Sequence, residues 1–242
     1  MSKDLPQHLS ERERSILTVA RAILHEHGSA GLRIADIAQA ADISVGTFYS
    51  HFESKEDLIL ALSSMAARGR AAGFQRVLDG DPFERELALP YAIFCNFLFS
   101  LDFPGLYEAE ELTANPGVWS AGTTERLESL RADMDRIADT FRELIRRAIA
   151  DGHVTQAADR EQQVHMLNQA AWILMAGGSN VHRTQLLLGR VQDKGRVLPP
   201  DFVEATRSML VGFGWCPGDV NETIRRARDL ALRRELTGCG SA

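Results

Sequence analysis

Several features are scarce in this sequence of 242 residues, and each scarcity excludes a class of protein. Its three cysteines lie far apart and form no CxxC pair, which argues against a disulfide framework or a zinc site. The most apolar window, residues 87–101, contains Pro90 and Asn96 and is shorter than the ~20 apolar residues that span a bilayer. The N-terminus has no apolar stretch of signal-peptide length, so we expect a cytoplasmic protein with no membrane partner.

Motifs of catalysis and metal binding are also missing. The chain has no GxSxG, no HExxH and no phosphate-binding loop, and no cysteine–histidine or carboxylate pair has a telling spacing. Glu108, Glu110 and Glu111 with His165 or His182 come nearest to a metal-ligand set, but their spacing indicates nothing specific. We therefore expect no enzymatic activity, no metal and no cofactor.

Positive charge is scarce where a nucleic-acid partner would need it. The chain has a net charge of −6, and residues 1–62 contain six Lys/Arg against nine Asp/Glu, a net of −3. A protein that binds DNA non-specifically is normally basic. If DNA is the partner, a few well-placed groups must bind it, because no general positive field exists.

What the sequence does contain is helical periodicity, with no sustained alternation of period two, so the fold class is all-α. Ser10 and Glu13 form a capping box at the start of the first helix, which Gly28 and Gly31 end. Further helices are predicted over 34–41, 44–49, from Ser54 onward, 82–101 with a kink at Pro90, 106–113, 123–151, 159–189, 200–212 and 220–236.

Charged side chains in the long helices are assigned to solvent by this periodicity. In the helix 123–151 we expect Arg126 and Asp133 to lie mainly outside. In the last helix we expect Arg225, Arg226, Arg233 and Arg234 to form a solvated face.

The two short helices at 34–41 and 44–49 are joined by a tight turn and are typical of a helix-turn-helix, whose second helix enters the major groove. Ser44 caps this second helix, so its positive end faces phosphates. Val45, Gly46 and Thr47 form its first turn, where small side chains permit a close approach to base edges.

Residues 16–62 resemble the N-terminal DNA-binding domain of the TetR family of transcriptional regulators. The resemblance rests on the segments LRIADIA at 32–38, ADISVGTFY at 41–49, His51-Phe52 and Ser54-Lys55-Glu56. It implies a homeodomain-like three-helix helix-turn-helix domain over residues 1–55. It also implies a C-terminal helical domain for effector binding and dimerisation over residues 56–242.

The resemblance implies DNA contacts by Thr47, Tyr49, His51 and Lys55. Two positions depart from the family pattern: Arg33 stands where a capping threonine or serine is usual, and Val45 where a polar residue is frequent. Arg33 can reach a phosphate, and Val45 offers only apolar readout such as a thymine methyl group. The candidate DNA-binding residues are therefore Arg33, Ser44, Val45, Gly46, Thr47, Tyr49, His51 and Lys55.

Structural explanations compete with these DNA-binding roles. Tyr49 is alternatively a packing residue with a hydrated hydroxyl group, Gly46 a glycine that eases helix packing, and Lys55 a solvated charge. His51 has a similar structural alternative. Phe48 and Phe52 are assigned to the core by spacing and are given no DNA role.

For the remainder of the chain, the resemblance implies a homodimer and a small-molecule pocket. The helices 159–189 and 200–212 are the expected interface, with an alternative in which the same face packs within its own subunit. Its members would be Leu167, Ala170, Ala171, Leu174, Met175 and Gly178. The candidate effector pocket is mostly aromatic with two amides and comprises Phe94, Asn96, Phe97, Phe103, Tyr107, Trp119, Phe141, Asn168 and Trp172.

The expected function is that of a ligand-responsive transcriptional regulator, preferentially a repressor, that binds palindromic operator DNA as a dimer. A small hydrophobic or amphipathic effector would release it by favouring a state with its recognition helices wrongly spaced. Activation in place of repression is not separable from the sequence. The alternative function is a ligand-binding or interaction protein with the TetR fold that does not bind specific DNA, an interpretation favoured by Val45, Arg33 and the acidic charge.

Overall fold

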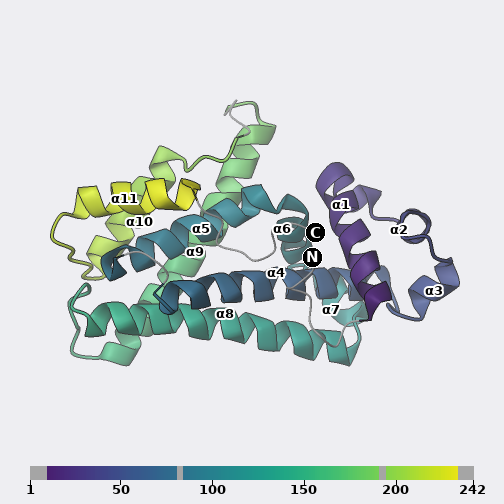
Figure 1. Cartoon of the computed structure of the whole chain (residues 1–242), viewed down its shortest axis with the longest axis horizontal. Helices are drawn as coiled ribbons and strands as arrows, with labels where there is room; N and C mark the ends of the chain where they lie inside the picture. Colours follow the sequence, from purple (N-terminus) through teal and green to yellow (C-terminus); the bar gives the residue numbers. More distant parts are fainter. Residues whose placement is uncertain (1–9, 81–83, 191–194, 234–242) are drawn as a thin grey trace. The chain divides into compact units, whose positions relative to one another are not determined.

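The computed structural model describes residues 10–80, 84–190 and 195–233, and over these residues the regular structure is helical apart from one isolated bridge, Val154–Trp215 (Figure 1). The elements are α1 (Glu11–Gly31), α2 (Ile34–Ala40), α3 (Val45–Tyr49), α4 (Lys55–Leu78), η1 (Arg85–Leu87), α5 (Ala88–Asp102), α6 (Pro104–Leu112), α7 (Pro116–Ala121), α8 (Thr124–Ala150), α9 (Arg160–Leu187), α10 (Pro200–Gly212) and α11 (Val220–Arg233). The predicted all-α class is confirmed.

The helices group into two compact units. Within the described residues, the first unit comprises 10–71 and 103–136, and the second comprises 72–80, 84–102, 137–190 and 195–233. Both α4 and α8 therefore contribute residues to each unit. The predicted domain boundary at residue 55 concerns function and stays a prediction, because packing units do not test it.

In the first unit, α1 begins as its sequence predicts. The Ser10 hydroxyl accepts the Glu13 N–H at 3.1 Å, and the Glu13 carboxylate accepts the Ser10 N–H at 3.0 Å. The apolar stripe Ile16, Leu17, Ala20 and Leu24 is buried. Gly28 breaks the helical course with φ +64°, a value that a residue with a Cβ rarely adopts.

Helix α6 lies very close to α1 because its second residue is glycine. A Cβ atom at Gly105 would lie 2.6 Å from the carbonyl oxygen of Arg21 and 3.0 Å from the backbone nitrogen of His25. Glu108 on the same helix accepts the Ser29 N–H at 2.7 Å, which satisfies a backbone donor just after the Gly28 break. The end of α1 is thus fixed by α6.

Two helix predictions need correction. The predicted kink at Pro90 within a helix over 82–101 is wrong: a short 3-10 turn precedes α5, which begins at Ala88, so Pro90 lies in the first turn of α5. Proline is tolerated there because first-turn N–H groups have no intrahelical partner. Pro82, where the predicted helix begins, lies outside the described residues.

Helix α7 was not predicted, because Asn115, Pro116 and Gly117 are typical of a loop. In the structure the Asn115 side chain caps this helix, and Pro116 is its first residue.

The core of the second unit is built around α5, most of whose residues are buried. Helices α9, α10 and α11 pack against it. The ring of Phe97 lies 4.4 Å from the ring of Phe202 on α10, measured between centroids. A Cβ atom at Gly178 on α9 would lie 2.4 Å from the Phe202 ring, so this glycine admits the aromatic side chain.

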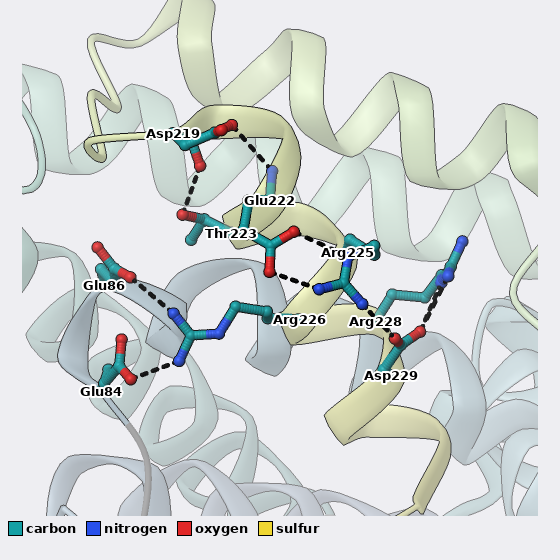
Figure 2. Close-up of polar contacts among 9 residues, drawn as sticks. All are labelled: Glu84, Glu86, Asp219, Glu222, Thr223, Arg225, Arg226, Arg228 and Asp229. Atoms are coloured by element: carbon teal, nitrogen blue, oxygen red, sulfur yellow. Dashed lines mark hydrogen bonds and ion pairs between the residues drawn. The ribbon is translucent and has the colours of Figure 1, made fainter.

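Helix α11 packs against α5, and hydrogen bonds link it to residues 84–86, which precede α5 in the chain. Figure 2 shows Arg226 between Glu84 and Glu86, whose carboxylates accept its N–H groups. Arg225 pairs within the helix with Glu222 and Asp229. The expectation of a wholly solvated arginine face is therefore wrong for Arg226. Arg234 lies outside the described residues.

Within the described ranges, no single helix is both long and apolar enough to cross a membrane. The neighbouring stretches Arg85–Asp102 and Pro104–Leu112 reach that length and composition only when they are taken together.

Candidate DNA-binding surface and the corner behind it

Helix α3 presents a small, uncharged surface. The Ser44 hydroxyl accepts the Thr47 N–H at 3.0 Å and lies 2.9 Å from the Thr47 hydroxyl. Val45 is 44% exposed and Tyr49 is 50% exposed, although both are large hydrophobic residues. The predicted cap is thus present, and the first turn of α3 is open to a partner.

Gly46 has a side-chain neighbour only in the cap itself. A Cβ atom there would lie 3.6 Å from the Ser44 hydroxyl, which is ordinary contact. No neighbouring helix approaches it among the described residues. The packing explanation for this glycine therefore has no support, and its small size serves the exposed surface.

Phe48 and Phe52 are fully buried, which confirms their assignment to the core. Their ring centroids lie 5.6 Å apart, and the Tyr49 ring meets Phe48 edge to face at the same distance. The tyrosine is thereby held at its ring while its outer part stays exposed. The turn before α3 contains Asp42 with φ +53°, a left-handed conformation that aspartate tolerates better than most residues.

The cations near α3 are partly occupied by intramolecular partners. Arg33 precedes α2 without capping it, and its Nε donates to the Asp36 carboxylate at 2.7 Å. The Lys55 ammonium donates to the Ser29 carbonyl at 3.2 Å and so satisfies an acceptor at the end of α1. Lys55 is therefore not simply a solvated charge, although an ammonium has further donors for a phosphate.

Arg126, near the start of α8, makes a cluster of contacts with α1, α4 and the segment after α3 that the sequence did not predict. The Arg126 guanidinium donates to Glu13 at 2.7 Å and to the His51 carbonyl at 3.4 Å, and it lies 5.0 Å from the centroid of the Phe52 ring. Its Nε lies 3.7 Å from the carboxylate of Asp57. Its side chain is only 19% exposed, so the expectation that Arg126 lies outside is wrong.

A second charged residue of α8 is also buried, contrary to the prediction. Asp133, which periodicity places outside, has a side chain only 4% exposed that accepts a hydrogen bond from Arg68 on α4 at 2.7 Å. Arg68 also donates to Ser129 at 2.8 Å. Periodicity assigns charges to solvent by default, and no signal in α8 marks the positions that meet an opposite charge on another helix.

The nine predicted pocket residues are divided between the two units. Phe103, Tyr107 and Trp119 belong to the first unit, and the other six belong to the second. Phe94 and Phe97 pack against Phe202 of α10, which the prediction missed. Phe141 packs against Phe74.

Two hollows occur elsewhere in the described chain, and none of the nine residues lines either. One, of about 320 Å³, lies among α1, α4 and α8 and includes Arg126 and Arg68. The other, of about 750 Å³, is more open and lies beside α11. The effector pocket stays a prediction.

The apolar face predicted for dimerisation is used inside the chain. Leu167, Ala171 and Met175 are buried in their own unit, which is the alternative that the sequence left open. A different stripe, on α9 and at Leu188 just after it, is exposed and carries Met166, Ile173, Val181, Leu187 and Leu188, with Ile173 at 70% and Leu187 at 83% exposure. Val211 on α10 is also exposed.

The carboxylates nearest to a metal-ligand set have other partners. Glu108 accepts the Ser29 N–H, and Glu110 accepts a hydrogen bond from the Arg70 guanidinium. In the part of the chain that the structure describes, no three His, Cys, Asp or Glu side chains are grouped to hold a metal ion.

The comparisons with known proteins agree with this geometry. Residues 16–62 match the family model described as "Bacterial regulatory proteins, tetR family". The chain is 32% identical over 79 residues to the HTH-type transcriptional regulator EthR of Mycolicibacterium smegmatis, a match that covers 33% of this chain and 36% of that protein. The chain therefore matches only about a third of the length of this curated relative.

Solved structures extend the likeness of fold to nearly the whole chain. The TetR family transcriptional regulator PfmR from Thermus thermophilus has a TM-score of 0.54 at 20% identity, covering 90% of this chain and 97% of that one. The transcriptional regulator FadR from Bacillus subtilis, in complex with stearoyl-CoA, has a TM-score of 0.54 at 16% identity, covering 83% and 97%.

The class of protein that the fold and this site define is that of helical proteins with an N-terminal helix-turn-helix. Over residues 16–62 the chain is similar to the TetR family of bacterial regulatory proteins, and its overall fold is similar to that of solved regulators of this family.

Proposed function

We propose that this chain is a transcriptional repressor that binds a palindromic operator as a dimer and releases it when a small effector binds. The observation that carries the proposal is the capped α3, which exposes Val45, Gly46, Thr47 and Tyr49. Arg33 precedes α2, and His51 and Lys55 follow α3. This is the arrangement of a recognition helix whose N-terminal end reads bases while its neighbours contact phosphates.

The dimer is supported by the exposed apolar stripe of α9. Isolated exposed hydrophobic residues are normal, but four along α9 and Leu188 just after it, with Val211 on α10, make a patch that a second copy would cover. A dimer would also place two recognition helices about one helical turn of DNA, ~34 Å, apart. Sedimentation analysis of an Ile173→Glu variant tests this: we expect dissociation to monomers, whereas an unchanged dimer contradicts the assignment.

An effector of hydrophobic or amphipathic character is supported by the aromatic side chains of α5 and α8 and by the stearoyl-CoA complex of the FadR structure. Such a ligand acts only through its different affinities for the DNA-bound and released states. A screen of acyl-CoA thioesters and small apolar compounds for release of bound DNA would identify it.

Fluorescence anisotropy on the DNA upstream of the chain's own gene is the first test. Wild-type protein should bind this DNA at least about a hundredfold more tightly than scrambled DNA, as specific binders do, and less tightly in higher salt. Tyr49→Phe removes one hydroxyl group from the exposed face and should weaken binding several-fold without changing the urea midpoint. Gln156→Glu, in an exposed loop, is the control.

Equal and weak binding to both DNAs, with no target recovered in a genome-wide selection, would favour the alternative function. In that case the chain would be a ligand-binding or interaction protein with the TetR fold, and the uncharged first turn of α3 would have no DNA to contact.

A further inference from the structure

We propose that the corner between α7 and α8 positions the DNA-reading head, with Arg126 as the positioning residue that fixes His51 and the start of α4. The inference rests on the proposed function, because it concerns how the same surface is held in a state that binds DNA. All residues of this corner lie in the first unit.

The start of α4 is bonded to the α7–α8 corner through three contacts. The Asp57 carboxylate accepts the N–H of Thr123 at 3.1 Å and its hydroxyl at 2.7 Å. The Ser54 hydroxyl donates to the Ala121 carbonyl at 3.1 Å and accepts the Asp57 N–H at 3.0 Å. Lys55 lies between the two residues that make these bonds, so its backbone is held at both sides.

Arg126 adds contacts on three further segments. It bonds to Glu13 on α1 and to the carbonyl of His51, stacks on the buried Phe52, and faces Asp57 on α4. One guanidinium on α8 therefore joins the start of α1, the segment after α3 and the start of α4. A planar group with five donors can make these contacts together, whereas an ammonium group cannot.

Both carboxylate partners of Arg126, Glu13 and Asp57, are poorly hydrated. Burial, the largest influence on Glu13, raises its pKa, but hydrogen bonds from Arg126 and from the Ser10 backbone and the charge of Arg126 outweigh it, so the pKa is lowered. The Asp57 side chain is 3% exposed. Breaking such a pair leaves a buried carboxylate without its cation, so the corner has one strongly preferred arrangement.

Through these bonds the start of α8 is linked directly to the backbone at His51 and near Lys55, two of the candidate DNA-binding residues. Thr123 and Arg126 lie at the start of α8, and they hold the backbone that carries His51 and Lys55. A change in the position of the start of α8 must therefore move these contacts or break the bonds.

The test uses the full chain and a double-mutant cycle on operator binding. Arg126→Gln should weaken operator binding about five- to tenfold, and Arg126→Lys should restore it only in part. The effect of Arg126→Gln should be non-additive with His51→Ala, whose backbone it holds, and additive with Arg33→Ala, which lies outside the corner. Arg142→Gln, which removes a surface arginine paired with Asp139 on the same helix, is the matched control and should change nothing.

Hydrogen exchange supplies a readout that needs no DNA. In Arg126→Gln the backbone amides of residues 50–57 should exchange at least about tenfold faster, while the buried amides of α9 keep their protection. The proposal would be overturned if Arg126→Gln bound the operator with wild-type affinity. It would also be overturned if the effect of Arg126→Gln were additive with that of His51→Ala as well as with that of Arg33→Ala. If the wild-type chain binds no operator, the proposed function fails separately, and unchanged exchange in residues 50–57 would then overturn the corner as well.

Discussion

The two sides of the helix-turn-helix head differ sharply in chemistry. The side that α3 exposes carries no charge from Val45 to Tyr49 and has open space around Gly46. The side that faces α6 and α8 contains buried or half-buried ion pairs, among them Arg126–Glu13, Arg68–Asp133 and Arg70–Glu110. These ion pairs join helices of the first unit, α8 to α1, α4 to α8 and α4 to α6, whereas charged residues such as Arg12, Glu26 and Asp42 are exposed.

This difference indicates which part of the head must supply the affinity for an acidic partner such as DNA. A domain with a net negative charge cannot rely on a general attraction to DNA, so contact geometry at α3 has to supply most of the specific binding. Buried ion pairs contribute little net stability, but each strongly disfavours arrangements that separate its members. Substitutions on the exposed side should therefore change DNA binding without changing stability. Those on the buried side should change stability or its pH dependence, and they should also change DNA binding where the residue positions the head, as Arg126 does.

The largest expected effect comes from placing a negative charge on the exposed side. Val45→Glu should lower operator affinity at least about a hundredfold, because the first turn of α3 would then repel phosphates and desolvate a carboxylate against base edges. Val45 is 44% exposed, so the unfolding free energy should change by less than about 0.5 kcal/mol. Anisotropy titration and urea unfolding measure the two quantities. Gln156→Glu adds the same charge elsewhere and should leave affinity unchanged; equal losses in both would show that net charge, not α3, governs binding.

A smaller effect, on stability, is expected from the buried side. Burial raises the pKa of Glu110 to about 7, although the charge of the neighbouring Arg70 acts to lower it. The folded chain therefore holds a proton that the unfolded chain has lost between the ordinary carboxyl pKa and about 7. Stability from this group is present below that window and is lost as pH rises through it, by an amount on the order of 1–3 kcal/mol.

Glu110→Gln removes this titration. Urea unfolding from pH 5 to pH 8 should show that the difference in unfolding free energy between wild type and variant shrinks or reverses as pH rises. Glu128→Gln, at an exposed position of α8, should keep the wild-type slope. A variant slope identical to that of the wild type would mean that Glu110 is ionised throughout by its contact with Arg70.

Helix α3, with its cap and the core residues beside it, is also the part of the molecule that the sequence predicts best. Ser44, Thr47, Phe48 and Phe52 are local features: a cap acts over three residues, and core spacing follows from one helix. The capping box of α1 was predictable for the same reason. Short-range physics therefore determines most of what α3 presents.

The buried side could not be predicted because its partners are distant in sequence. Arg126 meets Glu13 across 113 residues and the carbonyl of His51 across 75. Periodicity places a charged residue on a face of its own helix but does not say which other helix covers that face. The same limit explains why Arg226 was assigned to solvent and why the packing of Leu167, Ala171 and Met175 within their own unit was only one of two alternatives.

The smallest expected effect lies at the margin between the two sides. Arg33 is 74% exposed at its side chain and bonds to Asp36 within its own helix turn. Arg33→Ala should weaken operator binding only about two- to fivefold and reduce the slope of log affinity against log salt by about one, because one phosphate contact is lost. Asp36→Asn is the matched variant: it releases the guanidinium from its carboxylate and should strengthen binding slightly at the wild-type salt slope. If Arg33→Ala leaves the slope unchanged while Asp36→Asn weakens binding, the Arg33–Asp36 pair only supports α2, and the phosphate contacts of the head must come from Tyr49, His51 and Lys55.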